Sequence, residues 1–237
     1  MAKSVPGGIR SETVRLLGDV AAKMANGSLT HWHFERFAKG LNPFDLCAID
    51  WVGTYGLFGS DLKHDYVRFA NFHDLKPSNM WAVPVLRGLD CAKIIKAFEN
   101  LGVRMKLYDD DLDAEMFSDD RNPNRDGSYV AYFRNTDEGD CLNCSFEKLH
   151  QHRINSITIL ECLLLGLGFF FSFGKMQNTL RGVLCAGTKY CFDLVAVVSD
   201  GLDCVGNLEL RVEFVGIKEV SGHWTTRLLC PPKSSTV

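Results

Sequence analysis

Two cysteines and two histidines in the second half of the chain have the residue types and spacing of a zinc site. Cys141 and Cys144 form a Cys-x-x-Cys pair, and His150 and His152 follow shortly after it. Two thiolates and one or two imidazoles can complete a tetrahedral zinc shell. The chain has no second Cys-x-x-Cys pair, and the two histidines face one way only in an extended segment. Zinc is therefore one alternative, beside the simpler one in which the cysteines pack as small apolar residues.

A second candidate metal site is the acidic segment 109–120, which gathers seven carboxylates in twelve residues. Asp109, Asp111 and Asp113 are suitable oxygen ligands for a hard divalent cation such as Mg²⁺ or Ca²⁺ if the segment folds back on itself. Arg121 or Arg125 could then neutralise an anionic substrate, as in metal-dependent hydrolysis. The alternative is a solvated acidic loop.

A shorter pattern directly after this segment repeats the first half of a calcium-binding loop. Asn122, Asn124, Asp126 and Gly127 stand at the required spacing, but the twelfth position is Phe133 where such loops carry a bidentate Glu. Because the strongest ligand is missing, we predict a turn.

Residues 1–44 are predicted to form a helical hairpin, because apolar side chains recur at helical spacing on both sides of a tight Asn-Gly turn. The outward face of the second helix carries Trp32, Arg36 and Lys39, and two cations with an exposed aromatic ring can contact phosphates and stack on a base. A short turn between two helices also begins helix-turn-helix DNA readers. Residues 28–40 are thus a candidate contact surface for nucleic acid or protein. Packing of the hairpin on its own domain or a second subunit is the alternative.

The familiar catalytic signatures GxSxG, HExxH and GxGxxG are absent from the sequence. Ser145 and Lys148 match the bare Ser-x-x-Lys pattern of serine acyl-enzymes without the companion motifs, so we interpret the match as coincidence. The motifs predict no cofactor, and zinc or a hard divalent cation are the alternatives. Whether the chain is an enzyme stays open at this point.

The composition indicates a chain with a substantial core and no strong overall charge. Of the 237 residues 46% are hydrophobic, and 26 Lys and Arg stand against 29 Asp and Glu, a net charge of -3. This excludes a whole-protein attraction to nucleic acid or anionic membranes. Nine cysteines at irregular spacing, without a secretory signal pattern, predict reduced thiols and a cytoplasmic location.

Residues 157–173 are apolar except for one charge, Glu161. As a helix this run is about 25 Å long, short of the roughly 30 Å hydrocarbon core of a bilayer. Thr158 and Glu161 stand at capping-box spacing, which gives the carboxylate a place in the first turn. We predict a buried core helix here and no membrane partner.

The remaining pattern predicts an α+β fold, in which the N-terminal helical hairpin (1–44) precedes a mixed, mainly antiparallel sheet domain (45–237) around the buried central helix. A helix is expected at 91–101 and a hairpin break at Asp200-Gly201. Strands are expected at 46–52, 67–72, 80–85, 103–107, 129–134, 180–185, 192–198, 208–214 and 224–229.

Three stretches, 122–133, 157–165 and 184–189, together resemble a family of uncharacterised bacterial proteins found in environmental genomes. In that family a DRNPxxxGSY-like turn precedes an LLExLLLE-like helix and a TLCxGSR-like strand. The chain departs from the pattern at Cys162 and at Thr188-Lys189. The resemblance implies a bacterial cytosolic protein and assigns no catalytic residue, cofactor or partner.

Taken together, these observations favour a non-catalytic binding or interaction protein with the N-terminal hairpin as its contact surface. A metal-dependent hydrolytic enzyme that uses the 109–120 segment is the first alternative. Nucleic-acid binding through Trp32, Arg36 and Lys39 is the second.

Overall fold

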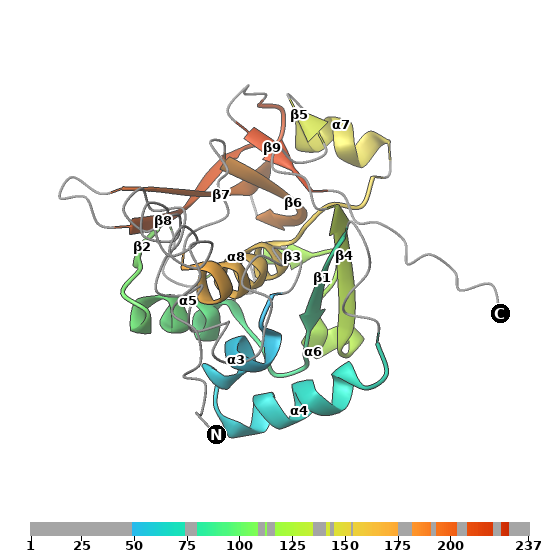
Figure 1. Cartoon of the computed structure of the whole chain (residues 1–237). Helices are drawn as coiled ribbons and strands as arrows, with labels where there is room; N and C mark the ends of the chain where they lie inside the picture. The colour runs from blue at the N-terminus through green and yellow to red at the C-terminus, as the bar shows by residue number, and fades with distance from the viewer. Residues whose placement is uncertain are drawn as a thin grey trace, which may run out of the picture. The chain divides into compact units, whose positions relative to one another are not determined.

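The computed structural model describes residues 49–73, 80–108, 112, 117–134, 141–142, 145–152, 154–174, 182–190, 193–202, 208–219 and 224–227. The helical hairpin predicted at 1–44, with its candidate residues Trp32, Arg36 and Lys39, lies outside these residues. The described part combines helices with two β-sheets, which confirms the α+β prediction (Figure 1).

The larger sheet is mixed and mainly antiparallel, as predicted. Its strands lie in the order β2 (Arg104–Leu107), β8 (Leu208–Gly216), β7 (Leu194–Leu202), β6 (Gly182–Tyr190), β9 (Trp224–Thr226) and β5 (Cys141–Leu142), while β3 (Phe117–Asp119) also pairs with β6. Only β2–β8 and β6–β9 are parallel pairs. Strand β6 is irregular between Leu184 and Lys189, where its register against β7 shifts.

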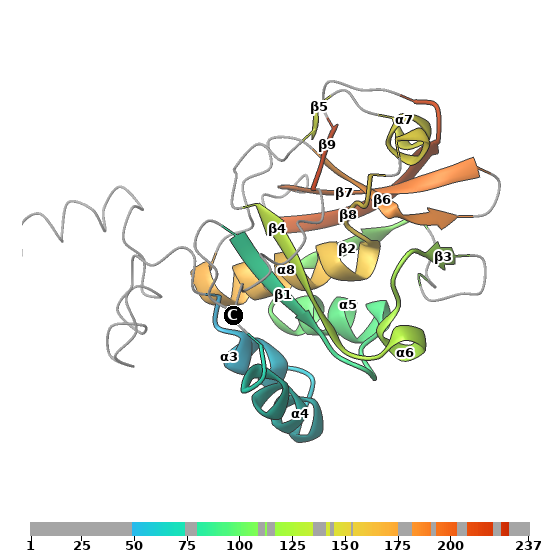
Figure 2. The same cartoon turned by 90° about the vertical axis from the view of Figure 1, so that its right-hand side faces the viewer.

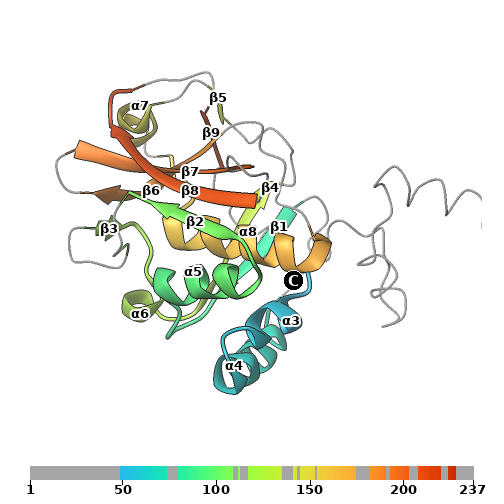
Figure 3. The same ribbon diagram turned by 90° about the vertical axis from the view of Figure 1, so that its left-hand side faces the viewer.

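Helix α8 (Ile159–Phe173) is the predicted central helix, and it lies between the larger sheet and helix α5 (Cys91–Asn100) in both side views (Figures 2 and 3). Thr158 and Glu161 form the predicted capping box, and Gly174 ends the helix in the left-handed conformation. A helix that is apolar on nearly every side is stable in water only when neighbours cover it all round. Within the described part, no helix has both the length and the apolar character needed to cross a membrane.

Helix α5 is amphipathic, and Asp90 caps its first turn by accepting a hydrogen bond from the Lys93 backbone N–H at 2.8 Å. Its apolar face packs on α8. Strands β1 (Met80–Val85) and β4 (Tyr129–Arg134) form the smaller, antiparallel sheet beside α8. The helix predicted at 91–101 and the strands predicted at 80–85 and 129–134 are therefore confirmed.

Two strands were predicted wrongly in the segment before β1. Of the predicted strand 46–52, residues 46–48 are not described, and residues 51–52 begin helix α3 (Trp51–Gly56). Helix α4 (Ser60–Ala70) includes residues 67–70 of the predicted strand 67–72. The buried and half-buried side chains of α4 recur every three to four residues (Leu62, Tyr66 and Phe69). The run 67–72 is too short to show this helical period, because an apolar stretch of that length fits a strand as well as a helix.

The hairpin break expected at Asp200-Gly201 is also wrong. Both residues lie inside β7, where Asp200 pairs with Leu210 and Gly201 with Glu209 of β8. An Asp-Gly pair favours a turn only where neighbouring strands can reverse, and here the backbone pairing continues past it.

The small helices attach to the two sides of this core. Helix α3 packs on α8 and on α4, where the Tyr55 and Tyr66 rings stack with centroids 4.9 Å apart. Helix α7 (Phe146–Gln151) covers the other face of the larger sheet, where Phe146 and Leu149 pack on residues of β6 and β7. The opposite face of those strands contacts α8, so the sheet is covered on both sides at this point.

Candidate functional site

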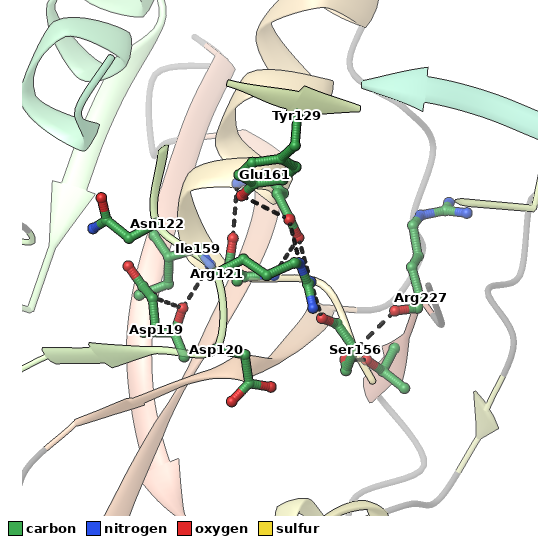
Figure 4. Close-up of polar contacts among 12 residues, drawn as sticks. Asp119, Asp120, Arg121, Asn122, Tyr129, Ser156, Ile159, Glu161 and Arg227 are labelled. Carbon is green, nitrogen blue, oxygen red and sulfur yellow. Dashed lines mark hydrogen bonds and ion pairs between the residues drawn. The ribbon is translucent and has the colours of Figure 1, made fainter. Parts of the chain in front are cut away.

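The most concentrated polar chemistry in the described residues surrounds the carboxylate of Glu161 (Figure 4). Its side chain is 0% exposed and accepts four hydrogen bonds. Arg121 donates from Nε to Oε1 and from Nη2 to Oε2, both at 2.8 Å. Tyr129 donates from its hydroxyl to Oε1 at 3.0 Å, and the Thr158 backbone N–H donates to Oε2 at 2.9 Å. Both oxygens of this buried charge are therefore fully satisfied.

The partners of Glu161 are held in fixed ionisation states. Burial alone would lower the pKa of the Arg121 guanidinium, but the hydrogen bonds and charge of Glu161 raise it overall. Burial, together with the Glu161 charge, raises the pKa of the Tyr129 hydroxyl. Arg121 also donates from Nη2 to the Ser156 carbonyl at 2.6 Å. This arrangement leaves no free lone pair on Glu161 for a substrate proton, so it joins elements rather than moving protons.

A second group of hydrogen bonds ties β3 and β6 to the start of α8. Thr188 donates from its hydroxyl to the Asp119 carboxylate and accepts a bond from the Ile159 backbone N–H at 2.9 Å. Thr188 lies in the irregular part of β6. The neighbouring Gly187 approaches the segment before α8 closely, and its backbone N–H donates to the Ile157 carbonyl at 2.9 Å. A Cβ atom at Gly187 would lie 2.6 Å from the Ser156 carbonyl oxygen, so only glycine fits.

Asp120 is the carboxylate of this region that faces outward. Its backbone N–H donates to the Gly187 carbonyl at 2.8 Å, while none of the hydrogen bonds within the described residues uses its side chain. Partial burial raises the pKa of the Asp120 carboxyl above its ordinary value, against the opposing charges of Arg121 and His150. Among the acids around α8, Asp120 is therefore the one whose carboxylate can contact a ligand or exchange a proton with solvent.

The predicted turn after Asp120 is the short helix α6 (Pro123–Asp126), and Asn122 caps it by accepting a bond from the Asn124 backbone N–H at 2.9 Å. Asn124 in turn accepts from the Gly88 backbone N–H at 2.7 Å and donates to the Leu89 carbonyl at 3.3 Å. These oxygens, which a calcium loop would use as ligands, are engaged in fixing the turn against the loop before α5.

Arg125, considered above as an anion-neutralising group, forms an exposed ion pair with Asp126 at 2.8 Å. The hydrogen bond from Arg125 lowers the pKa of Asp126 to about 2. Arg121 is committed to Glu161. Both arginines that were considered for an anionic substrate thus already have carboxylate partners.

The structure describes only part of the predicted zinc site. Cys144 and the side chain of Cys141 lie outside the described residues. His150 lies in α7 and stacks on the Phe146 ring with centroids 5.6 Å apart, and His152 is the C-cap residue of the same helix. Two residues apart on a helix, the imidazoles point to different sides, whereas a shared ligand set required an extended segment.

Asp109, Asp111 and Asp113, the ligands proposed for a hard cation, lie outside the described residues as well. In the part of the chain that is described, no three His, Cys, Asp or Glu side chains form a group that could hold a metal ion. The end of the predicted acidic loop is the strand β3.

The Ser-x-x-Lys match has a structural explanation. Ser145 is the N-cap of α7, and its hydroxyl accepts a hydrogen bond from the Lys148 backbone N–H at 3.2 Å. A serine three residues before its bonded N–H is the usual geometry of a helix cap. The interpretation of this motif as coincidence is consistent with that role.

Sequence reasoning missed the ion pair between Arg121 and Glu161. It assigned Glu161 to the capping box, which is correct, but gave its charge no counterion. A lone carboxylate in an apolar helix should have indicated a buried cation, because an unpaired buried charge is too costly to keep. The sequence still offered no means of choosing Arg121, forty positions away.

The three stretches that carry the family resemblance meet at this site. Tyr129 lies in the first stretch, Glu161 lies in the second, and Thr188 lies in the third. No family model, curated protein or solved structure matches the chain, so the resemblance stays a prediction.

Proposed function

We propose that this chain is a non-catalytic binding or interaction protein, with the α+β domain as a scaffold and the N-terminal residues 28–40 as its contact surface. One observation carries the proposal: Glu161, the most buried acid among the described residues, has all its hydrogen-bonding capacity filled by Arg121, Tyr129 and the capped helix start. Catalytic acids and bases need a free lone pair or proton directed at a substrate. The Glu161 carboxylate is bonded only to groups of the fold itself, and this supports a structural role for it within a scaffold.

The exposed charges near this cluster support the same proposal. Arg125 pairs with Asp126, and Lys189 pairs with Asp193 at 3.2 Å. A site for an anionic substrate would need cations that are not already paired.

The experiment has a binding arm and a catalytic arm. A photo-crosslinking amino acid replaces Arg36 in one variant and Lys218, an exposed residue of the α+β domain, in a matched control. We expect a defined macromolecular adduct, with protein or nucleic acid, from position 36 and not from position 218. Equal labelling from both positions, or none from position 36, overturns the assignment of the contact surface.

The catalytic arm tests the alternative directly. The purified chain is incubated with phosphomonoester, phosphodiester, carboxylic ester and peptide substrates, each with Mg²⁺, Mn²⁺ or Zn²⁺. We expect no turnover that differs between the chain and its Asp120→Asn variant. Metal-dependent turnover that this substitution abolishes overturns the non-catalytic proposal.

A metal-dependent hydrolytic enzyme is the second candidate, and Asp120 is the observation that favours it. Partial burial raises the pKa of its carboxyl against the opposing charges of Arg121 and His150, so it could serve as a general base or as one ligand of a cation. It needs further ligands, for which the 109–120 segment is the candidate source. The comparison with Asp120→Asn separates the two functions.

A further inference from the structure

Strand β2 forms one edge of the larger sheet (Figure 3). It pairs in parallel with β8, and among the described residues no strand lies on its other side. The Tyr108 backbone N–H donates to the Val212 carbonyl of β8 at 3.0 Å. Because successive residues of a strand direct their backbone groups to opposite sides, those of Met105 and Leu107 are directed to the open edge. Such an edge can take up a further strand from another molecule.

The side chains of β2 divide into a charged row and an apolar row. Arg104 and Lys106 are exposed, whereas the alternate residues Met105 and Leu107 are half-buried. This alternation follows from the period of two in a strand, which places the two rows on opposite faces of the sheet. A strand that added to this edge would therefore meet cations on one face and apolar side chains on the other.

The cation Lys106 lies directly opposite a second cation, Arg211 of β8. Neighbouring strands are about 4.8 Å apart, and like charges at opposite positions destabilise a sheet. Arg211 donates from Nε to Glu209 Oε1 at 2.6 Å, whereas the Lys106 ammonium has no ion pair or hydrogen bond within the described residues. Proteins keep local conflicts of this kind mainly at functional sites. An anionic group beside Lys106 would relieve the repulsion.

The charges on this face determine which partner fits. A second copy fits poorly, because two-fold pairing of two β2 edges would bring Arg104 and Lys106 of both copies together. A nucleic-acid backbone presents a continuous line of phosphates, and the exposed Glu213 lies on the same face of β8. An extended peptide in which acidic and apolar residues alternate matches both rows of β2, because its carboxylates lie beside the cations.

We propose that the open edge of β2 is a docking surface for an extended acidic peptide of a partner protein, which adds to the larger sheet as one more strand. Its backbone bonds to the edge-facing groups of Met105 and Leu107, and a carboxylate contacts Lys106. The backbone bonds hold the peptide in register, and the charges select its sequence. This surface is separate from residues 28–40, so the inference goes beyond the proposed function and does not depend on it.

Fluorescence anisotropy with the full chain tests the proposal. The probe is a fluorescein-labelled octapeptide of alternating Glu and Val, and an octapeptide of alternating Lys and Val is the control probe. We expect saturable binding of the Glu-Val probe only, weakened by salt. Lys106→Glu should lower the affinity about tenfold or more, because repulsion replaces attraction. The matched control Lys96→Glu makes the same charge change at an exposed position of α5 and should bind as the unmodified chain does.

A proline in β2 separates strand addition from simple ionic binding. Met105→Pro removes an N–H that faces the open edge and leaves the bonds between β2 and β8 in place. We expect this variant, folded by circular dichroism, to lose the probe as well. If it does not fold, Leu107→Pro removes the next edge-facing N–H and takes its place.

Several results would overturn the proposal. One is the absence of binding by the Glu-Val probe, and another is equal weakening in Lys106→Glu and Lys96→Glu. Full affinity in the folded proline variant excludes strand addition. Displacement of the probe by single-stranded DNA at an equal concentration of charges assigns the edge to nucleic acid, and a dimer that the probe dissociates assigns it to a second copy.

Discussion

The ion pair between Arg121 and Glu161 gives the sharpest quantitative prediction. The Glu161 carboxylate is 0% exposed, and the Arg121→Ala substitution removes two of its four hydrogen bonds together with its counterion. Removing one partner of a buried ion pair costs about 3–5 kcal/mol, because the remaining charge is neither solvated nor paired. For a chain of this size that loss lowers the Tm by roughly 10 °C.

The exposed arginine of α6 provides a matched control. Arg125 lies 2.8 Å from a carboxylate oxygen of Asp126, the same distance as in the buried pair, but in solvent. Exposed pairs contribute little because water already solvates both charges. We therefore expect Arg125→Ala to leave the Tm within experimental error, so that the difference between the two variants isolates burial.

Thermal and urea unfolding at pH 8 and pH 5 measure the effect. In Arg121→Ala the orphaned carboxylate can relieve its penalty by binding a proton, so the destabilisation should shrink as the pH falls. The double variant Arg121→Met, Glu161→Met should be more stable than Arg121→Ala, because it leaves no buried charge. A loss below about 1 kcal/mol in Arg121→Ala at pH 8 would refute the reasoning, since that is the range of a solvated pair.

Three further predictions concern packing, titration and binding. Gly168→Ala should lower the free energy of unfolding in urea by about 1–3 kcal/mol, because its Cβ would lie 2.7 Å from the Trp51 indole of α3. Gly166→Ala, whose Cβ has its nearest contact at 3.6 Å, should be neutral or stabilising in the same assay. Asp120→Asn should stabilise the fold slightly at pH 7, because a raised carboxyl pKa means that the charged form is disfavoured in the folded state, and the gain should vanish below pH 4. If the N-terminal residues bind nucleic acid, the affinity should fall steeply with salt and should drop when Arg36 and Lys39 both become Ala, and retained affinity in that variant excludes this mode.

Several local features follow from short stretches of sequence. The capping box of α8 needs only Thr158 and Glu161 at the correct spacing, and the burial of this helix needs only its apolar composition. The same holds for the amphipathic helix α5 and for strands β1 and β4, whose predicted bounds agree with the structure. The spacing of apolar residues predicts such helices and strands directly, because it shows which of their faces are buried.

Tertiary structure decided the features that depend on a partner distant in the sequence. Residues 67–70 belong to helix α4, whose Tyr66 ring stacks on Tyr55 of α3, a contact that the run 67–72 does not encode. Asp200-Gly201 stays in a strand because β8 pairs with it.

The chemistry of the site divides in the same way. The sequence by itself determined that Glu161 begins a buried helix, since capping and hydrophobicity are local properties. Only the packed fold brought Arg121 to Glu161, and it left Asp120 exposed. A sequence shows that a buried charge needs a partner, but the choice of partner depends on how the layers of the core come together.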